Sequence, residues 1–527
     1  MARRDREGLL RALEDPGYTP GRRDVTGLLE LLPDAPEAMV PRIERALLEQ
    51  PAESAARLPA TLPAATGDRG RLVHALGRLC VAEAAPWSAL HALLEDADVA
   101  VVKAAVAALA QSTAPDTEAA LLALWDRLGD RAPLRAVVRA LGRVGGDDSA
   151  ARLAALDEGD PRVGDELTRA RLMLDRRSHR EDVSEIDGAA RAPRPLVVNV
   201  ECQSSLAHIC AMEFTDAFIP KVLAPDRVQV TLRGPLDELA RCRVMKRFSF
   251  PLSHRTGEDP VQSTVDALCG DEAQAILRAF TRGTVRYRVE WAGRRTAGRS
   301  GLWQVAGEVQ KRVPSMVNDS RDPTWEVAVD RAVGGRIWLT PARWRDPRFT
   351  WRVADVPAAS HPTVAAALAS VAGVRPDDVV WDPFVGSAQE LVERARRGPY
   401  ARMVGNDTDT AALDAARKNL DAAGVERVTL VQRDAGIDPP TGVSLILTNP
   451  PFGYRTSFGL DLDPFLARFL GTAHRALRPG GRMVWLSPLP RETAEAARTL
   501  GMTARLVTAV WFGGHNVGLQ EITKPGG

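Results

Sequence analysis

The sequence is poor in cysteine and histidine, and neither residue type clusters along it. The five cysteines are odd in number and show no paired short spacing: Cys80, Cys202, Cys210, Cys242 and Cys269. This pattern argues against a disulfide framework and against a zinc site. The eight histidines are equally dispersed, and we interpret His361 and His515 as structural or incidental. We therefore expect reduced thiols and no bound metal.

Long apolar runs are also missing. No segment has about eighteen uninterrupted apolar residues, and residues 1–6 lack the apolar core of a signal peptide. A net charge of +1 on 527 residues gives no overall bias of sign. A chain of this length can hold about three domains at roughly 100–200 residues each. We expect a soluble, multidomain, cytoplasmic protein with no membrane segment.

The most informative motif that is present is Asn449-Pro450-Pro451-Phe452. It follows residues 443–448, an apolar run that predicts a buried parallel strand. Two prolines stop the strand and stiffen the loop. The Asn449 carboxamide and the Pro450 carbonyl can then act as two acceptors, and Phe452 can stack on a planar ring. The motif indicates methylation of an exocyclic amine, although a strand ending in a proline turn is the plainer alternative.

A series of strands and helices surrounds this motif. Residues 378–381, 403–407 and 428–431 predict strands, while residues 389–397 and 410–423 predict helices. Polar residues follow the strands, and ligands of open α/β sheets bind beyond those carboxyl ends. Asp382, Asp407, Asp434 and Asn449 should therefore line one crevice. Taken singly, each acid is as easily a cap or turn residue.

These residues resemble the THUMP-domain RNA guanine-N2 methyltransferases, which use S-adenosylmethionine. The similarity covers about residues 340–490 and is carried by residues 382–389, 405–409, 415–419 and 449–453, with the turn at 477–481 and the strand at 482–486 as a further element. The resemblance implies a Rossmann-like α/β fold. It implies cofactor contacts at Asp382, Phe384, Gly386, Ser387, Asp407, Asp434 and Ser360, and a target-base site at Asn449, Pro450, Pro451 and Phe452.

The chain departs from the family pattern at one turn. Where the family has Gly-Ser-Gly-Thr, this sequence has Gly386-Ser387-Ala388-Gln389. Alanine is tolerated there if its φ stays negative, but its methyl group narrows any place where backbone and ligand touch. The departure leaves a weakened cofactor site, or a binding-only domain, as an alternative.

The first part of the chain repeats. Ala-Leu pairs recur at intervals of 29, 33 and 32 residues, at Ala46-Leu47, Ala75-Leu76, Ala108-Leu109 and Ala140-Leu141. Such a period predicts stacked helix pairs, here a HEAT-like α-solenoid over residues 1–178, with an irregular helical bundle as the alternative. A solenoid offers an extended surface, so its expected role is to hold a protein partner or a substrate.

The middle of the chain predicts an α+β module. After a polar linker at residues 179–195, strands are expected at 196–200, 228–232, 285–289 and 325–329, with helices near 236–240 and 264–278. The family resemblance implies a ferredoxin-like part with a THUMP domain over residues 196–355. Residues 281–352 hold fifteen Lys and Arg against seven Asp and Glu, interleaved with Trp and Phe. This favours RNA contact through Arg343, Arg345, Arg348 and Arg352, or else a Trp core beneath a solvated Arg face.

Together these features predict an RNA methyltransferase whose catalytic domain occupies residues 356–527. Guanine N2 of tRNA or rRNA is the expected target, and the protein is expected to be a monomer. Two alternatives stay open. The same tetrapeptide suits a DNA adenine-N6 or a protein glutamine-N5 methyltransferase, and the altered turn suits a scaffold that binds RNA or protein without catalysis.

Overall fold

The protein was analysed as a computed structural model, which describes residues 6–15, 17–129, 133–157, 159–292, 300–357, 359–451, 462–512 and 515–526. The chain divides into two compact units. One comprises Met1–Val183 with Arg294–Asp322, and the other comprises Ser184–Gly293 with Pro323–Gly527. The predicted module at residues 196–355 therefore contributes to both units.

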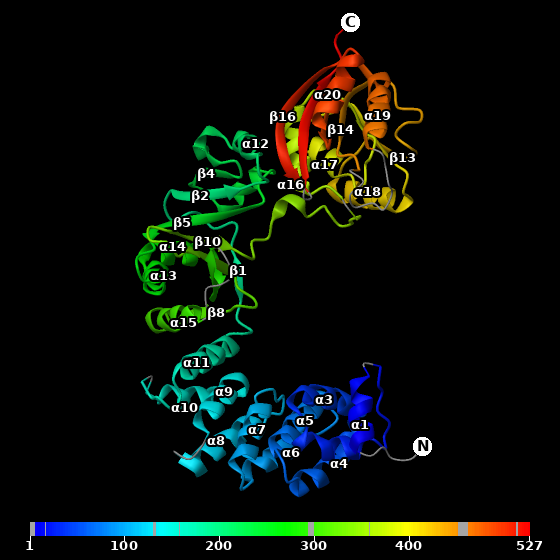
Figure 1. The fold of residues 1–527 in the computed structure, drawn as a ribbon. Coiled ribbons are helices and arrows are strands. Elements are labelled where there is room, and N and C mark those ends of the chain that lie inside the picture. Colours follow the sequence, from blue (N-terminus) through cyan, green and yellow to red (C-terminus); the bar gives the residue numbers. More distant parts are fainter. Residues whose placement is uncertain are drawn as a thin grey trace. The chain divides into compact units, whose positions relative to one another are not determined.

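The first unit is helical apart from one short strand, within the residues described (Figure 1). Its helices are α1 (Arg6–Glu14), α2 (Val25–Leu31), α3 (Val40–Glu49), α4 (Pro51–Ala64), α5 (Arg69–Val81), α6 (Ser88–Ala92), α7 (Val99–Leu109), α8 (Thr117–Leu128), α9 (Leu134–Val144), α10 (Asp147–Ala154), α11 (Asp165–Ser178) and α15 (Ser300–Arg312). The described part of this unit also includes the 3₁₀ turns η1 (Leu32–Asp34), η2 (Glu37–Met39) and η3 (Leu93–Glu95), and strand β8 (Met316–Asn318).

The repeated Ala-Leu pairs lie on α3, α5, α7 and α9, and all eight residues are buried. Helix α5 packs on α7, α7 on α9, and α9 on α11. Small residues make this packing close, because a Cβ atom at Gly77 would lie 2.7 Å from the Cβ of Ala108. Likewise, a Cβ at Gly142 would lie 2.6 Å from the Cα of Ala170. The period thus marks helices that stack in sequence order, while their assignment as a HEAT-like solenoid stays a prediction.

Helix α15 shows why residues 294–322 group with the helices. A Cβ atom at Gly307 would lie 2.6 Å from Cγ2 of Thr168 on α11, so the two helices meet closely. Beyond α15, the guanidinium of Arg176 donates to the carbonyl of Asn318 at 2.8 Å. The sequence alone did not suggest this association, because the contact is made across more than a hundred residues of chain.

The first part of the second unit is built on a mixed sheet. Its strands follow the order β3-β4-β2-β5-β10-β9-β7, antiparallel except between β7 and β9. They are β2 (Leu196–Glu201), β3 (Lys221–Ala224), β4 (Arg227–Leu232), β5 (Arg247–Arg255), β7 (Val285–Ala292), β9 (Trp325–Asp330) and β10 (Arg336–Pro341). A separate pair joins β1 (Ser184–Ile186) to β6 (Thr281–Gly283). All four predicted strands of this region are confirmed.

The helices of this region differ in detail from the prediction. They are α12 (Ala207–Met212), α13 (Pro260–Cys269) and α14 (Asp271–Ala279), with 3₁₀ turns η5 (Asp216–Phe218), η6 (Leu236–Arg241) and η7 (Pro347–Phe349). The single helix expected near residues 264–278 is two helices, because Gly270 adopts an extended conformation between them. Asp259 caps the first of them by accepting from the backbone N–H of Val261 at 2.8 Å.

The last part of the chain is a Rossmann-like domain with strand order β13-β12-β11-β14-β15-β17-β16. Strands β11 to β15 run parallel, and β17 and β16 add an antiparallel edge. The strands are β11 (Val379–Asp382), β12 (Arg402–Asp407), β13 (Val428–Gln432), β14 (Val443–Thr448), β15 (Leu477–Ser487), β16 (Thr503–Phe512) and β17 (His515–Thr523). The helices are α16 (Pro362–Ala372), α17 (Gln389–Ala395), α18 (Thr410–Ala423), α19 (Leu462–Ala476) and α20 (Pro490–Thr499). The predicted order of elements is confirmed.

Two helical layers enclose this sheet (Figure 1). Helices α16, α17 and α18 adjoin one another, whereas α19 and α20 pack around Trp381, Ile446 and Trp485 in a separate core. The prediction of a turn at 477–481 before a strand at 482–486 needs one change. Strand β15 already begins at Leu477, opposite Val443, and a register shift accommodates Gly480, whose φ is +74°.

Cysteine placement shows a contact that the sequence did not predict. Cys210 and Cys242 lie 32 residues apart, yet their Sγ atoms are 3.3 Å apart, well beyond a disulfide bond length. All five thiols are free. Burial and the neighbouring Cys202 and Cys242 thiols raise the pKa of Cys210, so it stays protonated. Within the described residues, no cluster of potential metal ligands occurs and no helix is long and apolar enough to cross a bilayer.

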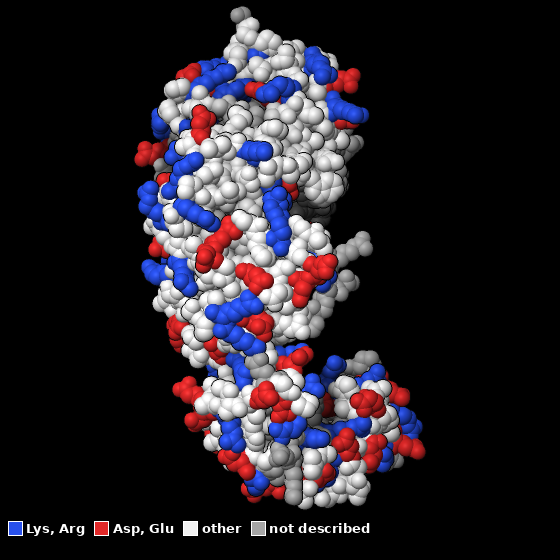
Figure 2. All heavy atoms as spheres, turned by 90° about the vertical axis from the view of Figure 1, so that its left-hand side faces the viewer, with Lys and Arg blue, Asp and Glu red and all other residues white. Residues whose placement is uncertain are grey.

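Charges of both signs share the surface. Figure 2 shows that, on the face it draws, Lys and Arg side chains are interspersed with Asp and Glu. The face drawn therefore carries no single broad field of one sign.

Candidate active site

Three strands of the Rossmann-like sheet end side by side. Asp382 closes β11 and pairs with Gly405 near the end of β12, and Trp381 pairs with Ile446 of β14. Asp407 closes β12, and Asn449 directly follows β14. The order of strands reverses beside β11, which is where ligands of open α/β sheets bind. The predicted gathering of Asp382, Asp407 and Asn449 at one edge is thus present.

The turn after β11 is tied to β12. The backbone N–H of Gly386, at a φ of +49°, donates to Oδ2 of Asp407 at 3.0 Å. A Cβ atom at Gly386 would lie 3.9 Å from Cγ2 of Val356, an ordinary van der Waals contact, so the positive φ and not crowding favours glycine here. The turn therefore presents bare backbone beside a carboxylate, as a nucleotide site requires.

Ala388 departs from the favourable case considered from sequence. Its φ is +65° and its ψ is 30°, which is the left-handed region and not a negative φ. The residue is fully buried at the start of α17. A side chain in this conformation costs roughly 1–2 kcal/mol relative to glycine, so the altered turn carries backbone strain.

Asn449 is held by a chain of buried hydrogen bonds. Its Nδ2 donates to Oγ of Ser360 at 2.9 Å, and that hydroxyl donates to Oε1 of Glu390 at 2.5 Å. The Oδ1 atom of Asn449 is buried and has no hydrogen-bond partner among the described residues. Because unpaired buried acceptors are costly, this oxygen is a position for a donor from outside the chain.

Asp382 presents a second unpaired oxygen. Its Oδ1 accepts from Oγ1 of Thr448 at 2.7 Å and from the N–H of Phe384 at 3.2 Å. Its Oδ2 is buried without a partner in the described part of the chain. Desolvation raises the pKa of Asp382 well above its usual range, and the nearby Glu390 carboxylate raises it further. An external cation or donor at Oδ2 would restore the charged form.

Glu390 is the acid that sequence reasoning missed. Its side chain is buried, and desolvation raises its pKa to about 7, against the opposing hydrogen bond from Ser360. Glu393, one turn later on α17, makes a bidentate ion pair with Arg243 at 2.6 and 2.7 Å. The two acids stand three residues apart on α17 beside Arg394, which is an ordinary pattern for a solvated helix face, so the sequence gives no signal of their burial.

Asn419 is a further connector. Its Oδ1 accepts from the N–H groups of Val353 and Ala354, both at 2.9 Å. Its Nδ2 donates to the carbonyls of Ala354 and Ser387, at 2.8 and 2.9 Å. One buried amide thus fastens the segment before the domain to the turn after β11. Residues 415–419 carried part of the family resemblance, but this role needed the structure.

The remaining predicted cofactor residues are less central. Ser387 is buried, and its hydroxyl accepts from Nε2 of Gln389 at 3.1 Å. The Phe384 ring packs on α19, with its centroid 5.1 Å from that of Phe469. Asp434 is exposed after β13 and accepts from the N–H of Gly436 at 2.7 Å. Pro450 is buried and Pro451 half-buried, while Phe452 lies outside the described residues.

The four arginines expected at RNA divide into two groups. Arg348 was wrongly assigned, because it is 3% exposed and its Nη1 donates to the carbonyls of Cys242 and Met245 at 2.6 and 2.7 Å. A phosphate contact needs an exposed head group, so Arg348 has a structural role. Arg343 and Arg345 are exposed, and the head group of Arg352 lies 2.6 Å from Asp355.

Residues 350–517 match a family model described as UPF0020, RMKL-like, methyltransferase domain. This part of the chain is a methyltransferase domain. The domain carries the strand-end carboxylates and the Asn449 loop described above.

Named relatives share this domain. The chain is 35% identical over 128 residues to the "U6 snRNA (guanine-N(2))-methyltransferase THUMPD2" of Bos taurus, covering 24% of this chain and 25% of that protein. It is 31% identical over 192 residues to the "tRNA (guanine(6)-N2)-methyltransferase" of Thermus thermophilus, covering 35% of this chain and 56% of that protein. A crystal structure of TrmN from Thermus thermophilus aligns with 22% identity and a TM-score of 0.49, covering 62% of this chain and 99% of that one. The chain thus spans between a quarter and just over half of the two curated relatives.

Proposed function

We propose that the protein is an S-adenosylmethionine-dependent RNA methyltransferase acting on an exocyclic amine, with guanine N2 of tRNA or rRNA as the target. The observation that carries this proposal is the buried, unpaired Oδ1 of Asn449 at the edge where β11, β12 and β14 end. The methyltransferase domain and the relatives named as RNA guanine-N2 methyltransferases support the same reaction and substrate class.

The residues present fit the cofactor. The turn at Gly386 has no side chain there, so the cofactor would lie against its backbone. Asp407 would accept from the ribose hydroxyls of the cofactor. The unpaired Oδ2 of Asp382 would accept from the ammonium group of the methionine part. Asp434, exposed at the end of β13, would accept from the adenine amine. When bound, the cofactor supplies an electrophilic methyl group.

The Asn449 loop would orient the substrate. Oδ1 of Asn449 and the carbonyl of Pro450 accept the two N–H groups of the amine, which turns its lone pair toward the methyl carbon. The amine nitrogen so oriented would take the methyl group that the bound cofactor supplies, and one amine proton would leave to water. Phe452 is proposed to stack on the base. No group in the described part of the loop needs to act as a base.

Ser360 would serve this step indirectly. Its hydroxyl holds Nδ2 of Asn449 at 2.9 Å and so keeps Oδ1 directed toward the substrate. The strain at Ala388 favours the alternative of a weak cofactor site. Titration calorimetry with S-adenosylmethionine distinguishes a methyltransferase from a scaffold that binds only RNA or protein. Such a scaffold would give no heat of cofactor binding.

The other parts of the chain are proposed to hold RNA and partners. Residues 1–178 would form a HEAT-like surface for a protein partner or substrate, followed by a linker at 179–195. Residues 196–355 would form a THUMP-like RNA-binding module, to which Arg343, Arg345 and Arg352 contribute. Residues 356–527 would carry out the transfer, in a cytoplasmic monomer.

The deciding experiment is incubation with labelled cofactor and total RNA, followed by mass spectrometry of the nucleosides. N2-methylguanosine is the expected product. In parallel incubations with DNA and with protein, label in N6-methyladenine or in glutamine would favour the rival assignments, which use the same acceptor geometry.

A further inference from the structure

We propose that a hollow in the central sheet, beside Arg255 and Arg336, binds a backbone phosphate of the RNA substrate. Nothing in the methyltransferase site accounts for this hollow, which has a volume of about 320 Å³ and is lined by β2, β4, β5, β10 and α14. The inference rests on the proposed function, because it takes RNA as the ligand.

The hollow arises where two neighbouring strands separate. Strand β2 pairs with β5 only through residues 199–201, so Leu196 and Val197 lie apart from β5. On the other side of β5, the register with β10 shifts between Arg336 and Trp338. Pro251 has no N–H to donate, and the N–H of Ser253 donates to Glu272 of α14 at 2.7 Å instead. The sheet is therefore open at this point.

Two cations face each other at one end of the opening. Arg255 and Arg336 are directly opposite in the antiparallel ladder, and both are exposed. Like charges in this position repel and destabilise a sheet. In the part of the chain that the structure describes, neither Arg255 nor Arg336 forms a hydrogen bond or ion pair with a carboxylate. The only carboxylate among the described residues that line the hollow, that of Glu272, binds Ser253 and lies near Arg194, so the charges of Arg255 and Arg336 are not compensated there.

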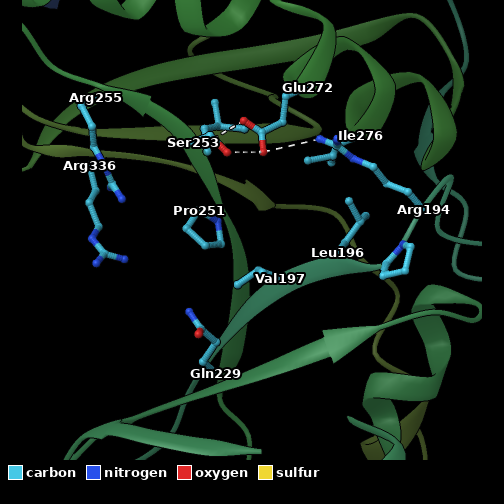
Figure 3. Close-up of a pocket in the computed structure, with 12 residues that line it drawn as sticks. Arg194, Leu196, Val197, Gln229, Pro251, Ser253, Arg255, Glu272, Ile276 and Arg336 are labelled. Carbon is cyan, nitrogen blue, oxygen red and sulfur yellow. Dashed lines mark hydrogen bonds and ion pairs between the residues drawn. The ribbon is translucent and has the colours of Figure 1, made fainter. Parts of the chain in front are cut away.

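At the other end of the hollow, the carboxylate of Glu272 already has hydrogen-bond partners. Glu272 accepts from the N–H and the hydroxyl of Ser253, at 2.7 and 3.0 Å, and lies 3.6 Å from Arg194. Figure 3 shows Arg194 and Glu272 on one side of the hollow and Arg255 with Arg336 on the other. The residues that line the hollow include three arginines and one carboxylate, and the local excess of positive charge lies at Arg255 and Arg336.

The lining of the hollow suits a phosphate group of an RNA backbone. Pro251 and Val197 lie between the two ends, and Gln229 lies at the rim, where its Nε2 donates to Oδ1 of Asn199 at 3.4 Å (Figure 3). Two guanidinium groups provide the planar donor pairs that bind phosphate oxygens well.

The test compares two charge-matched variants. Arg255→Ala/Arg336→Ala removes the proposed site. Arg247→Ala/Arg282→Ala removes two exposed arginines from the same unit, which pair with Glu201 and Glu185. RNA affinity is measured without cofactor, by fluorescence anisotropy, from about 50 to 200 mM salt. Thermal unfolding of each variant establishes that it is folded.

The expected result is a slope of log affinity against log salt that is shallower by about 0.7–0.9 in the first variant, as for one lost phosphate contact, and unchanged in the second. Arg255→Lys/Arg336→Lys should retain the slope because it retains the charge. Equal slopes in both alanine variants would overturn the inference. So would inorganic phosphate that displaces RNA from the wild-type protein at equal concentration, since that assigns the hollow to a free anion.

Failure of the proposed function gives a different pattern. Wild-type protein that binds no RNA and methylates none would contradict the function itself. Wild-type protein that methylates RNA, with a slope unaffected by the first variant, contradicts only the phosphate site.

Discussion

The side-chain amide of Asn449 donates to the hydroxyl of Ser360 at 2.9 Å, although the two residues are 89 positions apart. This bond decides which end of the amide faces the substrate. With Nδ2 engaged, Oδ1 is left as an unpaired acceptor at the strand ends. The orientation of a single amide thereby links the segment before α16 to the proposed chemistry.

Removing the hydroxyl of Ser360 should release that amide. Ser360→Ala is expected to lower kcat about tenfold, equivalent to about 1.4 kcal/mol, because Asn449 can then present Nδ2 to the amine. Cofactor affinity, measured by calorimetry, should change little. Ser370→Ala, on the following helix α16, is the control, and an equal loss in both variants would contradict a positioning role for Ser360.

Replacing Asn449 itself should be more severe. Asn449→Ala removes the proposed acceptor and is expected to lower kcat/KM at least a hundredfold, with cofactor binding retained. Single-turnover methylation of a bound RNA measures the effect on chemistry alone. An unchanged single-turnover rate would show that this side chain does not hold the amine.

The strained turn offers a stability test. Ala388→Gly should raise the free energy of unfolding by about 1 kcal/mol, because glycine adopts a φ of +65° without a Cβ clash. Ala422→Gly, at an exposed position of α18, should lower it by a similar amount. Denaturant unfolding measures both. Two changes of the same sign would show that Ala388 carries no strain.

Glu390 should make stability depend on pH. Its pKa in the folded protein is raised to about 7 from an ordinary 4.5, chiefly by burial, so the folded state holds the proton more tightly than the unfolded chain. Stability should then fall as pH rises between these two values and stay level above about 7. The loss would be roughly 3 kcal/mol, from 1.36 kcal/mol per pH unit.

Glu390→Gln should reduce this dependence to the part that Asp382, whose pKa is also raised, still contributes, because the amide oxygen can accept from Ser360 but carries no charge. Unfolding free energies at pH 5 and pH 8 for both proteins provide the comparison. A wild-type protein that is equally stable at both pH values would contradict the raised pKa. Glu83→Gln, at an exposed position, serves as the control.

Arg348 should matter for stability and not for RNA. Arg348→Ala leaves the carbonyls of Cys242 and Met245 and the carboxylate of Asp346 without their donor, at an expected cost of about 3 kcal/mol or more. Arg345→Ala, at an exposed residue, should cost less than about 0.5 kcal/mol. Thermal unfolding distinguishes them, and an equal cost would contradict the buried role.

Much of the methyltransferase domain could be read from local pattern. The run at residues 443–448 and the helix at 410–423 were predicted with the bounds that the structure has, because apolar period and capping residues act over a few positions. Asp409, which caps α18 through the N–H of Ala411 at 2.9 Å, is such a local signal. The gathering of strand ends followed from the rule for open α/β sheets.

Contacts between distant segments could not be read in this way. The sequence established the succession of strands and helices along the Rossmann-like domain, the Asn449-Pro450-Pro451 loop and the repeated Ala-Leu pairs, since each rests on spacing along the chain. Only the tertiary structure decided that Ala388 has a positive φ, that Arg348 is buried, that Ser360 and Glu390 hold Asn449, and that Arg255 faces Arg336. Burial and hydrogen-bond partners depend on which surfaces meet in three dimensions, and a residue's type alone does not determine that.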